Sequence, residues 1–378
     1  MMTDAPSLTL GIEEEYLLVD RQTGALVAKP PQSMFKECQD QLDGQVMPEF
    51  LRCQIEVGTT VCKTISEARA ELGHLRKVVN KVAASHDMAI ISASTHPFGE
   101  AEDQRFTQKQ RYQDLARDLG EPMRRMMICG LHVHAGIEDK DLRIELMNQV
   151  RYFLPHLLCL STSSPFWQGR DTMLDSYRLA VFRELPRTGL PEQFASWRDY
   201  QRNVQSLVEV GALEDATKIW WPIRPSDRFP TVELRVADAC TRLDDTMTIA
   251  ALYLCLMRRL YRMGGDNLTW RPYSNLQIEQ NLWQAQHDGM KNGLIDFSRG
   301  TIAPMKDLVE ELLELVAEDA EALDCVAEVE NARTIVKRGT SAQCQRKIYA
   351  DAIAAGDDED QALRKVAHWL IMETAAYL

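Results

Sequence analysis

Four short segments of the sequence place two polar side chains at positions i and i+2 between apolar neighbours. Side chains two residues apart on a β-strand project from the same face of the sheet, so each pair would act together. The pairs are Glu13 and Glu15, Gln54 and Glu56, His132 and His134, and Glu233 and Arg235. We therefore expect four strands that present carboxylates, imidazoles and a guanidinium on one polar face.

The composition of this polar face distinguishes it from an ordinary solvated one. Any single pair is more typical of a solvated strand, or of a histidine satisfied inside the core, than of an active site. Solvated strand faces are usually rich in Lys, Thr, Ser and Gln, whereas the cores of these four segments contain no Lys. Taken together, the four pairs favour a functional site over a solvated face.

Carboxylates gathered on one face need a positive partner, because neighbouring carboxylates resist joint ionisation. Oxygen ligands at this density suit hard cations such as Mg²⁺ or Mn²⁺, and Mg²⁺ is usually shared with substrate phosphates. Arg235 on the same face supplies a bidentate contact for a phosphate or a carboxylate. The pattern therefore predicts metal-dependent phosphoryl chemistry inside a concave, carboxylate-lined sheet.

The motifs that the sequence lacks narrow the chemistry further. It contains no G-x-x-x-x-G-K-[ST] phosphate loop, no G-x-G-x-x-G, no G-x-S-x-G and no H-E-x-x-H. A bound ATP would therefore be held through metal ions and arginines rather than through a glycine-rich loop.

The elements that would carry the four pairs alternate with helices along the first two thirds of the chain. Apolar and alternating runs predict strands over residues 8–19, 51–57, 88–93, 126–137, 218–224 and 231–237. Helical spacing predicts helices over residues 65–86, 142–160 and 244–263, the last with Asp244 as N-cap, and an almost continuous helical part from Ser274 onward. Residues 161–175 are predicted to form a loop that either covers the site or simply connects two elements. This order indicates an α+β fold with a mixed or antiparallel sheet rather than a Rossmann or barrel fold.

The overall composition is that of a soluble globular chain of 378 residues with a formal net charge of −13. We expect one catalytic domain over residues 1–378, with a sheet-bearing portion at 1–240 and a mostly helical portion at 241–378. The acidic balance disfavours nucleic-acid binding, and no apolar run reaches the length of about 18 residues that a membrane span needs. Nine cysteines without a C-x-x-C pair, and no signal-peptide pattern, indicate reduced thiols in a cytoplasmic protein.

Eight segments, which include three of the four pairs, also resemble a known family when they are read in order. The sequence resembles the glutamate–cysteine ligase superfamily, and within it the bacterial YbdK-type carboxylate–amine ligases. The matching segments are LGIEEEYLLVD from Leu10, STHPF at 94–98, GLHVHAGI at 130–137, SSPFWQGRDT at 163–172, WWPIRPS at 220–226, TVELRVADA at 231–239, NLWQAQHDGMKNGLID at 281–296 and, more weakly, GTSAQ at 339–343. Each segment alone has low specificity, whereas the ordered set covers most of the chain.

The resemblance implies a fold related to glutamine synthetase and the guanidino kinases. In that fold a curved, mostly antiparallel sheet forms a funnel, with ATP and metal ions on its concave side and helices on its convex side. The resemblance also implies a reaction between small molecules. ATP phosphorylates a substrate carboxylate, an amine attacks the acyl phosphate, and an amide, ADP and phosphate are released. Glutamate–cysteine ligase activity is one candidate, and the residues that would select the two substrates are not recognisable in the sequence.

The resemblance further implies roles for individual residues. The metal ligands for Mg²⁺ or Mn²⁺ would be Glu13, Glu15, Glu56, His132 and Glu233. Arg235, with Glu233, would be catalytic and would meet the transferred phosphate, and the further candidates for phosphate or substrate contacts are Arg224, Arg178 and His134. Family habit also suggests a homodimer or a larger homo-oligomer.

Two other functions are compatible with the same residues. A guanidino-type phosphotransferase would stop at phosphoryl transfer, and an assay that requires both a carboxylate and an amine separates it from a ligase. A non-catalytic nucleotide-binding relative would be expected to have lost some of the metal and phosphate residues, and all six of the principal ones are present.

Overall fold

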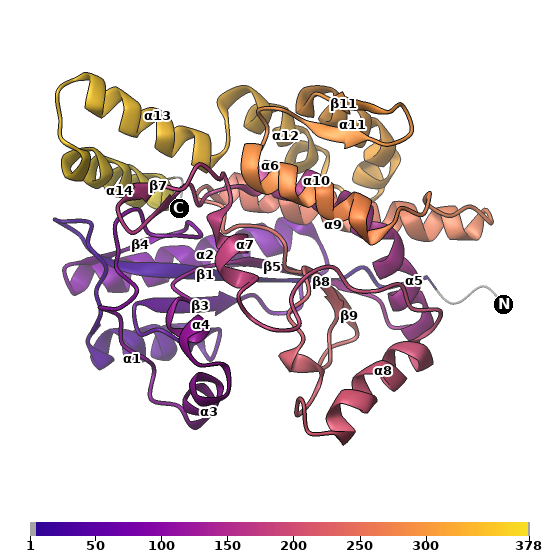
Figure 1. The fold of residues 1–378 in the computed structure, drawn as a ribbon, viewed down its shortest axis with the longest axis horizontal. Coiled ribbons are helices and arrows are strands. Elements are labelled where there is room, and N and C mark those ends of the chain that lie inside the picture. The colour runs from indigo at the N-terminus through magenta and orange to yellow at the C-terminus, as the bar shows by residue number, and fades with distance from the viewer. Residues whose placement is uncertain (1–4, 377–378) are drawn as a thin grey trace.

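One sheet of seven strands runs through the centre of the molecule, and all of its pairings are antiparallel (Figure 1). The computed structural model describes residues 5–376, apart from the side chain of Arg111. The strands are β1 (Leu10–Asp20), β2 (Val46–Pro48), β3 (Gln54–Gly58), β4 (Met88–Ile91), β5 (Leu131–Gly136), β8 (Ile223–Pro225) and β9 (Thr231–Leu234). Their order is β2-β3-β1-β5-β9-β8, and β4 also pairs with β1. The predicted α+β class and the mostly antiparallel sheet are confirmed.

The central strand β1 has two faces of different character. Ile12, Tyr16 and Leu18 are buried on one face among apolar side chains, whereas Glu13 and Glu15 lie on the other. The pleat produces this alternation, because successive side chains point to opposite sides of the sheet. The period-2 pattern in the sequence therefore corresponds to a covered face and a polar face.

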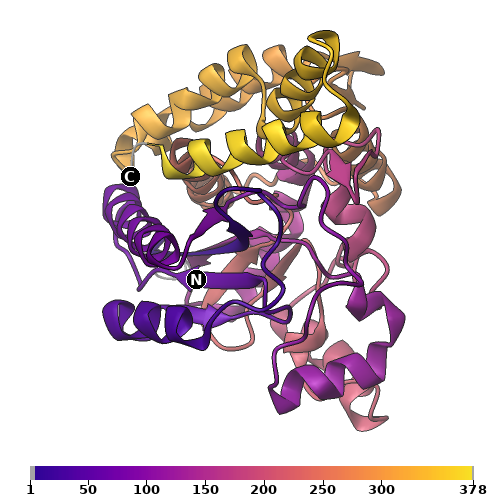
Figure 2. The same ribbon diagram turned by 90° about the vertical axis from the view of Figure 1, so that its left-hand side faces the viewer.

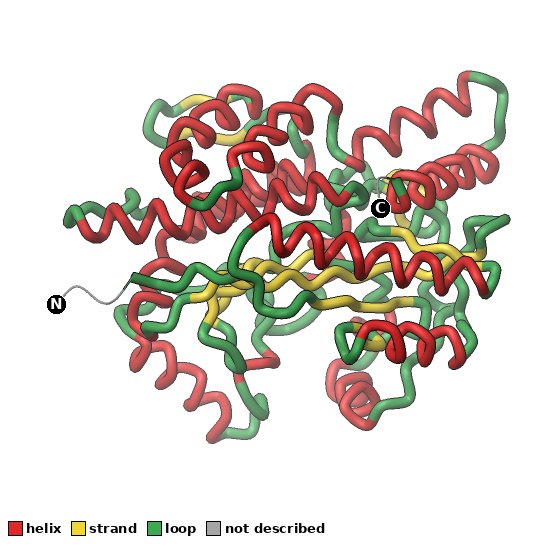
Figure 3. Tube along the Cα trace, turned by 180° about the vertical axis from the view of Figure 1, so that it is seen from behind, coloured by secondary structure: helices red, strands yellow, loops and turns green. Residues whose placement is uncertain are grey.

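Helices cover the apolar face and contribute most of the core. These helices are α1 (Gln32–Leu42), α2 (Ile65–Ser85), α5 (Lys140–Val150) and α9 (Leu243–Gly265). Seen from behind, helices lie across the strands of the sheet (Figure 3). Helix α2 begins where Thr64 accepts a hydrogen bond from the Glu67 N–H, and it buries Leu72, Leu75 and Val79 at its apolar face.

The C-terminal third is mainly helical and lies along one side of the sheet (Figures 1 and 2). Its helices are α10 (Asn275–Asp288), α11 (Met305–Ala322), α12 (Val326–Arg338), α13 (Ser341–Ala354) and α14 (Glu359–Ala375). Helix α14 packs on β4, and its Val366 and Leu370 join Leu17 and Val19 of β1 in a separate apolar cluster. Helix α14, the last helix of the chain, therefore covers this face of the sheet at the end of β1 that carries Leu17 and Val19.

Shorter elements complete the fold on the polar side and in the connections. They are α3 (Gln110–Leu119), α4 (Glu121–Arg124), α6 (Leu154–Ser161), α7 (Tyr177–Phe182), α8 (Trp197–Glu209), the 3₁₀ turns η1 (Arg151–Phe153) and η2 (Ala216–Lys218), and the hairpins β6 (Phe166–Trp167) with β7 (Arg170–Asp171) and β10 (Leu294–Asp296) with β11 (Thr301–Ala303). Within residues 5–376, no helix has the length and apolar character that a membrane span requires.

Several predicted boundaries are wrong, and each has a local cause. The predicted helix 142–160 is divided into α5, η1 and α6, and Pro155 lies in the first turn of α6, where its missing N–H costs nothing. The predicted strand 218–224 is a 3₁₀ turn followed by the short β8. Helix α9 has Arg242 rather than Asp244 as its N-cap, and Asp244 lies in the first turn. The predicted loop 161–175 contains the β6–β7 hairpin, and the helical C-terminal part contains β10–β11.

Candidate active site

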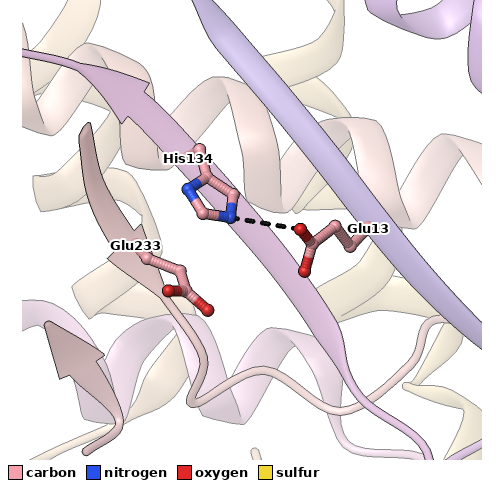
Figure 4. Close-up of side chains that lie close together, drawn as sticks. All are labelled: Glu13, His134 and Glu233. Atoms are coloured by element: carbon pink, nitrogen blue, oxygen red, sulfur yellow. Dashed lines mark ion pairs between the residues drawn. The ribbon is translucent and has the colours of Figure 1, made fainter. Parts of the chain in front are cut away.

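Three adjacent strands bring Glu13, His134 and Glu233 together on the polar face (Figure 4). β5 lies between β1 and β9, and its register places His134 directly opposite Glu233. One ligand atom from each of the three residues lies within 4.8 Å of the others. His134 Nε2 is 3.5 Å from Glu13 Oε1, and its Nδ1 is 2.9 Å from the hydroxyl oxygen of Thr231.

The donors of this cluster fit a divalent cation. His134 Nε2 is buried and has no hydrogen-bond partner among the described residues, although it faces two carboxylates. A buried polar atom without a partner is costly, and a metal ion bound to Nε2 would remove that cost. Two carboxylates and one imidazole are ligands that divalent cations accept.

His132 lies beside this cluster and also contacts Glu13. Its Nδ1 is 3.1 Å from Glu13 Oε2. Burial and the nearby charge of Arg235 lower the pKa of His132 to about 4, so its imidazole is neutral at pH 7. Burial raises the pKa of Glu13, but the hydrogen bond with His132 and the nearby imidazole of His134 outweigh it and hold that pKa well below its ordinary value. Glu13 is therefore an ionised carboxylate flanked by two imidazoles.

Glu15 and Glu56, with Glu49 beside them, form a second group of crowded carboxylates on the polar face. The register places them directly opposite each other on β1 and β3. Burial and the charge of Glu49 raise the pKa of Glu15 to about 8, although the Gly130 N–H donates a hydrogen bond to it over 2.8 Å. Burial and a hydrogen bond with Glu49 raise the pKa of Glu56 well above its ordinary value. The group lacks the positive charge that would allow all three carboxylates to ionise.

Two arginines bind Glu233, which with Glu13 and His134 forms what we call the metal-type cluster. Arg224 Nε donates to Glu233 Oε2 over 2.8 Å, and Arg235 Nη1 donates to Oε1. Burial raises the pKa of Glu233, but the charges of Arg235 and Arg224 outweigh it and hold that pKa far below its ordinary value. The Arg235 Nε is buried and has no partner among residues 5–376. The Arg235 guanidinium therefore retains a donor for an anion.

Arg178 of α7 anchors the chain that follows β9. Its guanidinium donates to the carbonyl oxygens of Arg235 and Val236 over 3.1 and 3.3 Å, and it lies 4.0 Å from Asp238. Gly130 lies directly against it, because a Cβ atom added there would lie 2.5 Å from Arg178 Nη2. A side chain at this position would displace Arg178, which explains why the segment begins with glycine.

Much of the predicted loop 161–175 is buried inside the protein. Its residues Ser161 to Phe166 are buried. Asp238 accepts hydrogen bonds from the Ser163 N–H and the Ser164 hydroxyl over 2.9 and 2.7 Å, and Arg346 of α13 binds Asp171 at 3.0 Å. The buried half of the loop connects the sheet to the C-terminal helices and does not lie over the carboxylates as a cover.

A pocket of about 160 Å³ opens beside the crowded carboxylates. Its polar lining consists of Glu15, Glu49, Gln54, His132, Arg178 and Arg235. The rest of its wall is mainly apolar, includes Tyr112 and Trp220, and comes from α3, α4, α7 and the neighbouring loops.

The sequence analysis did not find Glu49 or the apolar part of this pocket. Glu49 is a single carboxylate in the segment MPEFL and has no i+2 polar partner. Its only signal in the sequence is its place five residues before the Gln54–Glu56 pair. The predicted site residues lie on the polar side of the sheet and around this pocket. Arg224 lies on β8, the strand at the edge of the sheet.

Comparison with known proteins assigns the chain to a family. A family model described as glutamate–cysteine ligase family 2 matches residues 9–363. The chain belongs to glutamate–cysteine ligase family 2. A relative from Rhodospirillum rubrum, named "Putative glutamate–cysteine ligase 2", is 55% identical over 99% of this chain and 97% of its own. A relative of the same name from Jannaschia sp. is 52% identical over 96% of each chain.

Solved structures show the fold of this family 2 chain. The glutamate–cysteine ligase of Francisella tularensis, in complex with AMP, aligns with a TM-score of 0.69 at 15% identity over 98% of this chain and 89% of its own. A bifunctional glutathione synthetase from Pasteurella multocida aligns with the same TM-score over 97% of this chain and 52% of its own. These structures confirm the predicted fold. The family match and the named relatives confirm the predicted family and enzyme class, an ATP-dependent ligase.

Proposed function

We propose that this family 2 member is a carboxylate–amine ligase that forms an amide through an acyl phosphate. The observation that carries the proposal is the grouping of Glu13, His134 and Glu233 beside Arg224 and Arg235 on one side of the sheet. Such a site suits the transfer of a phosphoryl group, which needs metal ligands and fixed positive charge at the same place. The names of the relatives make glutamate and cysteine the first substrate pair to test.

Glu13, His134 and Glu233 would hold a Mg²⁺ or Mn²⁺ ion, and His132, Glu15 and Glu56 complete the proposed set of ligands. A cation bound there would neutralise the negative charge of the phosphate oxygens of ATP. His134 is added to the predicted ligands because its buried Nε2 faces both carboxylates. Glu49 is added because it shares the crowded group with Glu56.

The arginines of the chain would stabilise and orient the anionic groups. Arg235 would donate to the transferred phosphoryl group through its unpartnered Nε, while its bond to Glu233 fixes the plane of the guanidinium. Arg224 is positioned by Glu233 and by the carbonyl oxygen of Ile219. Arg178 would hold the backbone of Arg235 in place and line the substrate pocket.

The proposed reaction has two steps. A carboxylate oxygen attacks the γ-phosphorus of ATP, and the bond to the β-phosphate oxygen breaks to release ADP. The amine nitrogen then attacks the acyl carbon, phosphate leaves with its bridging oxygen, and the amine loses one proton as the amide forms. Water must be kept from the acyl phosphate between the steps, and the mainly apolar wall of the pocket favours this.

The test of the ligase is ADP release with Mg²⁺ across a panel of carboxylates and amines. We expect release that requires both partners and yields the amide. Glu233→Gln should fold and lose turnover, whereas Glu314→Gln, at an exposed position of α11, should behave as wild type. Phosphorylation of a guanidino compound without amide formation would instead indicate the phosphotransferase alternative.

We further propose that the chain forms one catalytic domain, that the protein is cytoplasmic and that it is a homodimer. A single apolar cluster extends from Leu8 to Ile335, which supports one folding unit with a sheet-bearing part at 1–240 and a helical part at 241–378. All nine cysteines are free thiols and eight of them are buried, which is compatible with a reducing compartment. A monomeric mass by light scattering at micromolar concentration would contradict the dimer.

A further inference from the structure

Building on the metal site of the proposed function, we infer that Thr231 is a positioning residue for that site. Its side chain holds the imidazole of His134 in the orientation in which Nε2, rather than a ring carbon, faces Glu13. Thr231 therefore acts through His134 and does not itself bind the cation. This role rests on the proposed function, because it requires that His134 bind a cation.

Thr231 reaches His134 because of the way in which β9 pairs with β5. The register places His134 opposite Glu233, and Gly136 opposite Thr231. Thr231 and Glu233 are two residues apart on β9, so both side chains project from the same face of the sheet. The imidazole of His134 therefore lies near both of them, and its Nδ1 is 2.9 Å from Thr231 Oγ1.

The contact with Thr231 selects one of two orientations of the His134 ring. A half turn about the Cβ–Cγ bond would exchange each ring nitrogen for a carbon atom. In the observed orientation Nε2 lies 3.5 Å from Glu13 Oε1, and the other ring nitrogen points away from that carboxylate (Figure 4). The turned ring would present carbon atoms to Thr231 and Glu13 and would lose the hydrogen bond. Thr231 therefore favours the orientation that offers a ligand atom to a cation.

The hydroxyl group of Thr231 also suits the tautomer that a bound cation requires. A cation on Nε2 takes the lone pair of that nitrogen, so the single ring proton of a neutral His134 is on Nδ1. The Thr231 hydroxyl oxygen can accept this N–H, because a hydroxyl group both donates and accepts hydrogen bonds. Histidines that bind metals usually donate their other ring N–H to a fixed acceptor, which holds the ring in place.

Among the described residues, no other group holds Nδ1 of His134. Its one hydrogen-bond partner is Thr231. Phe229 packs against the imidazole edge to face, with the ring centroids 6.0 Å apart and the planes at 90°. The Phe229 ring has no hydrogen-bonding atom, so it restricts the tilt of the imidazole but does not distinguish its nitrogens from its carbons.

His132, the other histidine of the pair on β5, uses its ring differently. Its Nδ1 is 3.1 Å from Glu13 Oε2. In His134 the corresponding nitrogen is engaged by Thr231, so Nε2 is the atom left for Glu13. The two histidines thus contact the same carboxylate through different nitrogens, and Thr231 accounts for the choice at His134.

The experiment is a calorimetric titration of the full chain with Mn²⁺, in the absence and in the presence of ATP. Thr231→Val removes the hydroxyl group and keeps the branched shape that suits a strand. We expect it to raise the dissociation constant for Mn²⁺ about 10–100-fold. Thr231→Ser keeps the hydroxyl group and should stay within about threefold of wild type.

A matched control is Thr301→Val. Thr301 is exposed and lies in β11, outside the seven-stranded sheet, so this variant should bind Mn²⁺ as the wild type does. If Thr231→Val fails to fold, Thr231→Ala takes its place beside Thr231→Ser.

The Mg²⁺ dependence of turnover separates positioning of the ligand from a general loss of structure. In Thr231→Val the Mg²⁺ concentration for half-maximal ADP release should rise about 10–100-fold. At saturating Mg²⁺ kcat should stay within about threefold of wild type, because the groups that contact the substrates are unchanged. A damaged fold would lower kcat at every Mg²⁺ concentration.

The outcomes distinguish this role of Thr231 from the proposed function. Wild-type affinity for Mn²⁺ in Thr231→Val, or an equal loss in Thr231→Ser, would overturn the role and leave the metal site intact. If wild type binds no Mn²⁺ with or without ATP, the metal site and the role of Thr231 are both wrong. If no substrate pair supports ADP release, the ligase proposal fails, and the Mn²⁺ titration still decides the role of Thr231.

Discussion

Glu13 and Glu14 are neighbours on β1, yet they belong to two regions of the molecule with opposite chemistry. Glu14 points into the helix-covered core and is 0% exposed. Glu13 points to the polar face, where it contacts His132 and His134. The comparison shows how one strand can carry both a structural and a functional carboxylate, since the pleat alone separates their surroundings.

The covered face gives its carboxylate a full set of partners from within the chain. Arg76 of α2 donates to Glu14 Oε1 and Oε2 over 2.5 and 2.7 Å, and Arg76 is itself 0% exposed. Tyr16 and Thr246 each donate a hydroxyl hydrogen bond to Glu14 over 2.6 Å. This network joins β1, α2 and α9, and it needs nothing from outside the protein.

The polar face leaves its carboxylates short of positive charge. Glu15 and Glu56 lie opposite each other with Glu49 nearby, and the pKa values of Glu15 and Glu56 are raised. The region with satisfied charges therefore holds the fold together, and the region with unsatisfied charges is where we propose that a cation and a substrate bind. Four predictions test this division.

The largest difference is expected between matched substitutions at adjacent positions. Glu14→Gln leaves Arg76 buried without a counter-charge and should lower the free energy of unfolding by about 3–5 kcal/mol. Glu13→Gln should lower it by clearly less than Glu14→Gln, because the imidazole of His132 beside it is neutral, and should instead abolish turnover. Urea unfolding without metal measures both. Equal losses at the two positions would contradict the division between the faces.

The second prediction applies the same comparison to β9 and the residue after it. Leu234 is 0% exposed on the covered face, so Leu234→Ala should cost about 2–5 kcal/mol of stability through the cavity it leaves. Arg235→Lys removes the planar fork and should lower kcat by about 10²–10³, with nucleotide binding partly retained. A fully active Arg235→Lys enzyme, measured with any substrate pair that supports ADP release, would remove Arg235 from the catalytic site.

Metal binding should act on the polar face alone. A divalent cation at hundredfold excess over its dissociation constant should raise the free energy of unfolding by about 2.7 kcal/mol. Thermal unfolding with Mg²⁺ or Mn²⁺ measures this gain as a rise in melting temperature. Glu13→Gln should lose the rise, and Leu234→Ala should keep it despite a lower starting temperature. No rise for the wild-type protein, with or without ATP, would argue against the metal site.

The last prediction concerns the pH dependence of stability in the absence of metal. Burial raises the pKa of Glu15 from 4.5 to about 8. Below about pH 7 the lowered pKa values of His96, His132 and His156 act in the opposite direction, because the unfolded chain binds their protons. Between about pH 7 and 8 only the folded chain keeps the Glu15 proton, so the free energy of unfolding should fall as pH rises over this range. Glu15→Gln should reduce this slope, and Glu56 should account for what remains. A stability that rises with pH over this range in the metal-free protein would contradict the crowded carboxylates.

The pattern of polar pairs allowed a correct prediction of the sheet and of its polar face. Alternation along β1 and the spacing of apolar residues in α2 are local properties, because a strand repeats every two residues and a helix every 3.6. For the same reason, the sequence pattern does not show where the helices within residues 142–160 end or where the strand within residues 218–224 begins. A 3₁₀ turn and a short strand end have no strong period of their own.

The residue types of the sequence by themselves determined which side chains could bind a metal and a phosphate, and on which face of each strand they lie. Only the tertiary structure decided that β5 lies between β1 and β9, and therefore that His134 meets both Glu13 and Glu233. It also decided that Glu14 pairs with Arg76, 62 residues further along the chain, and that α3, α4 and α7 form the mainly apolar wall of the pocket. Strand order and helix packing depend on the sum of many long-range contacts, and no local period in the sequence records that sum.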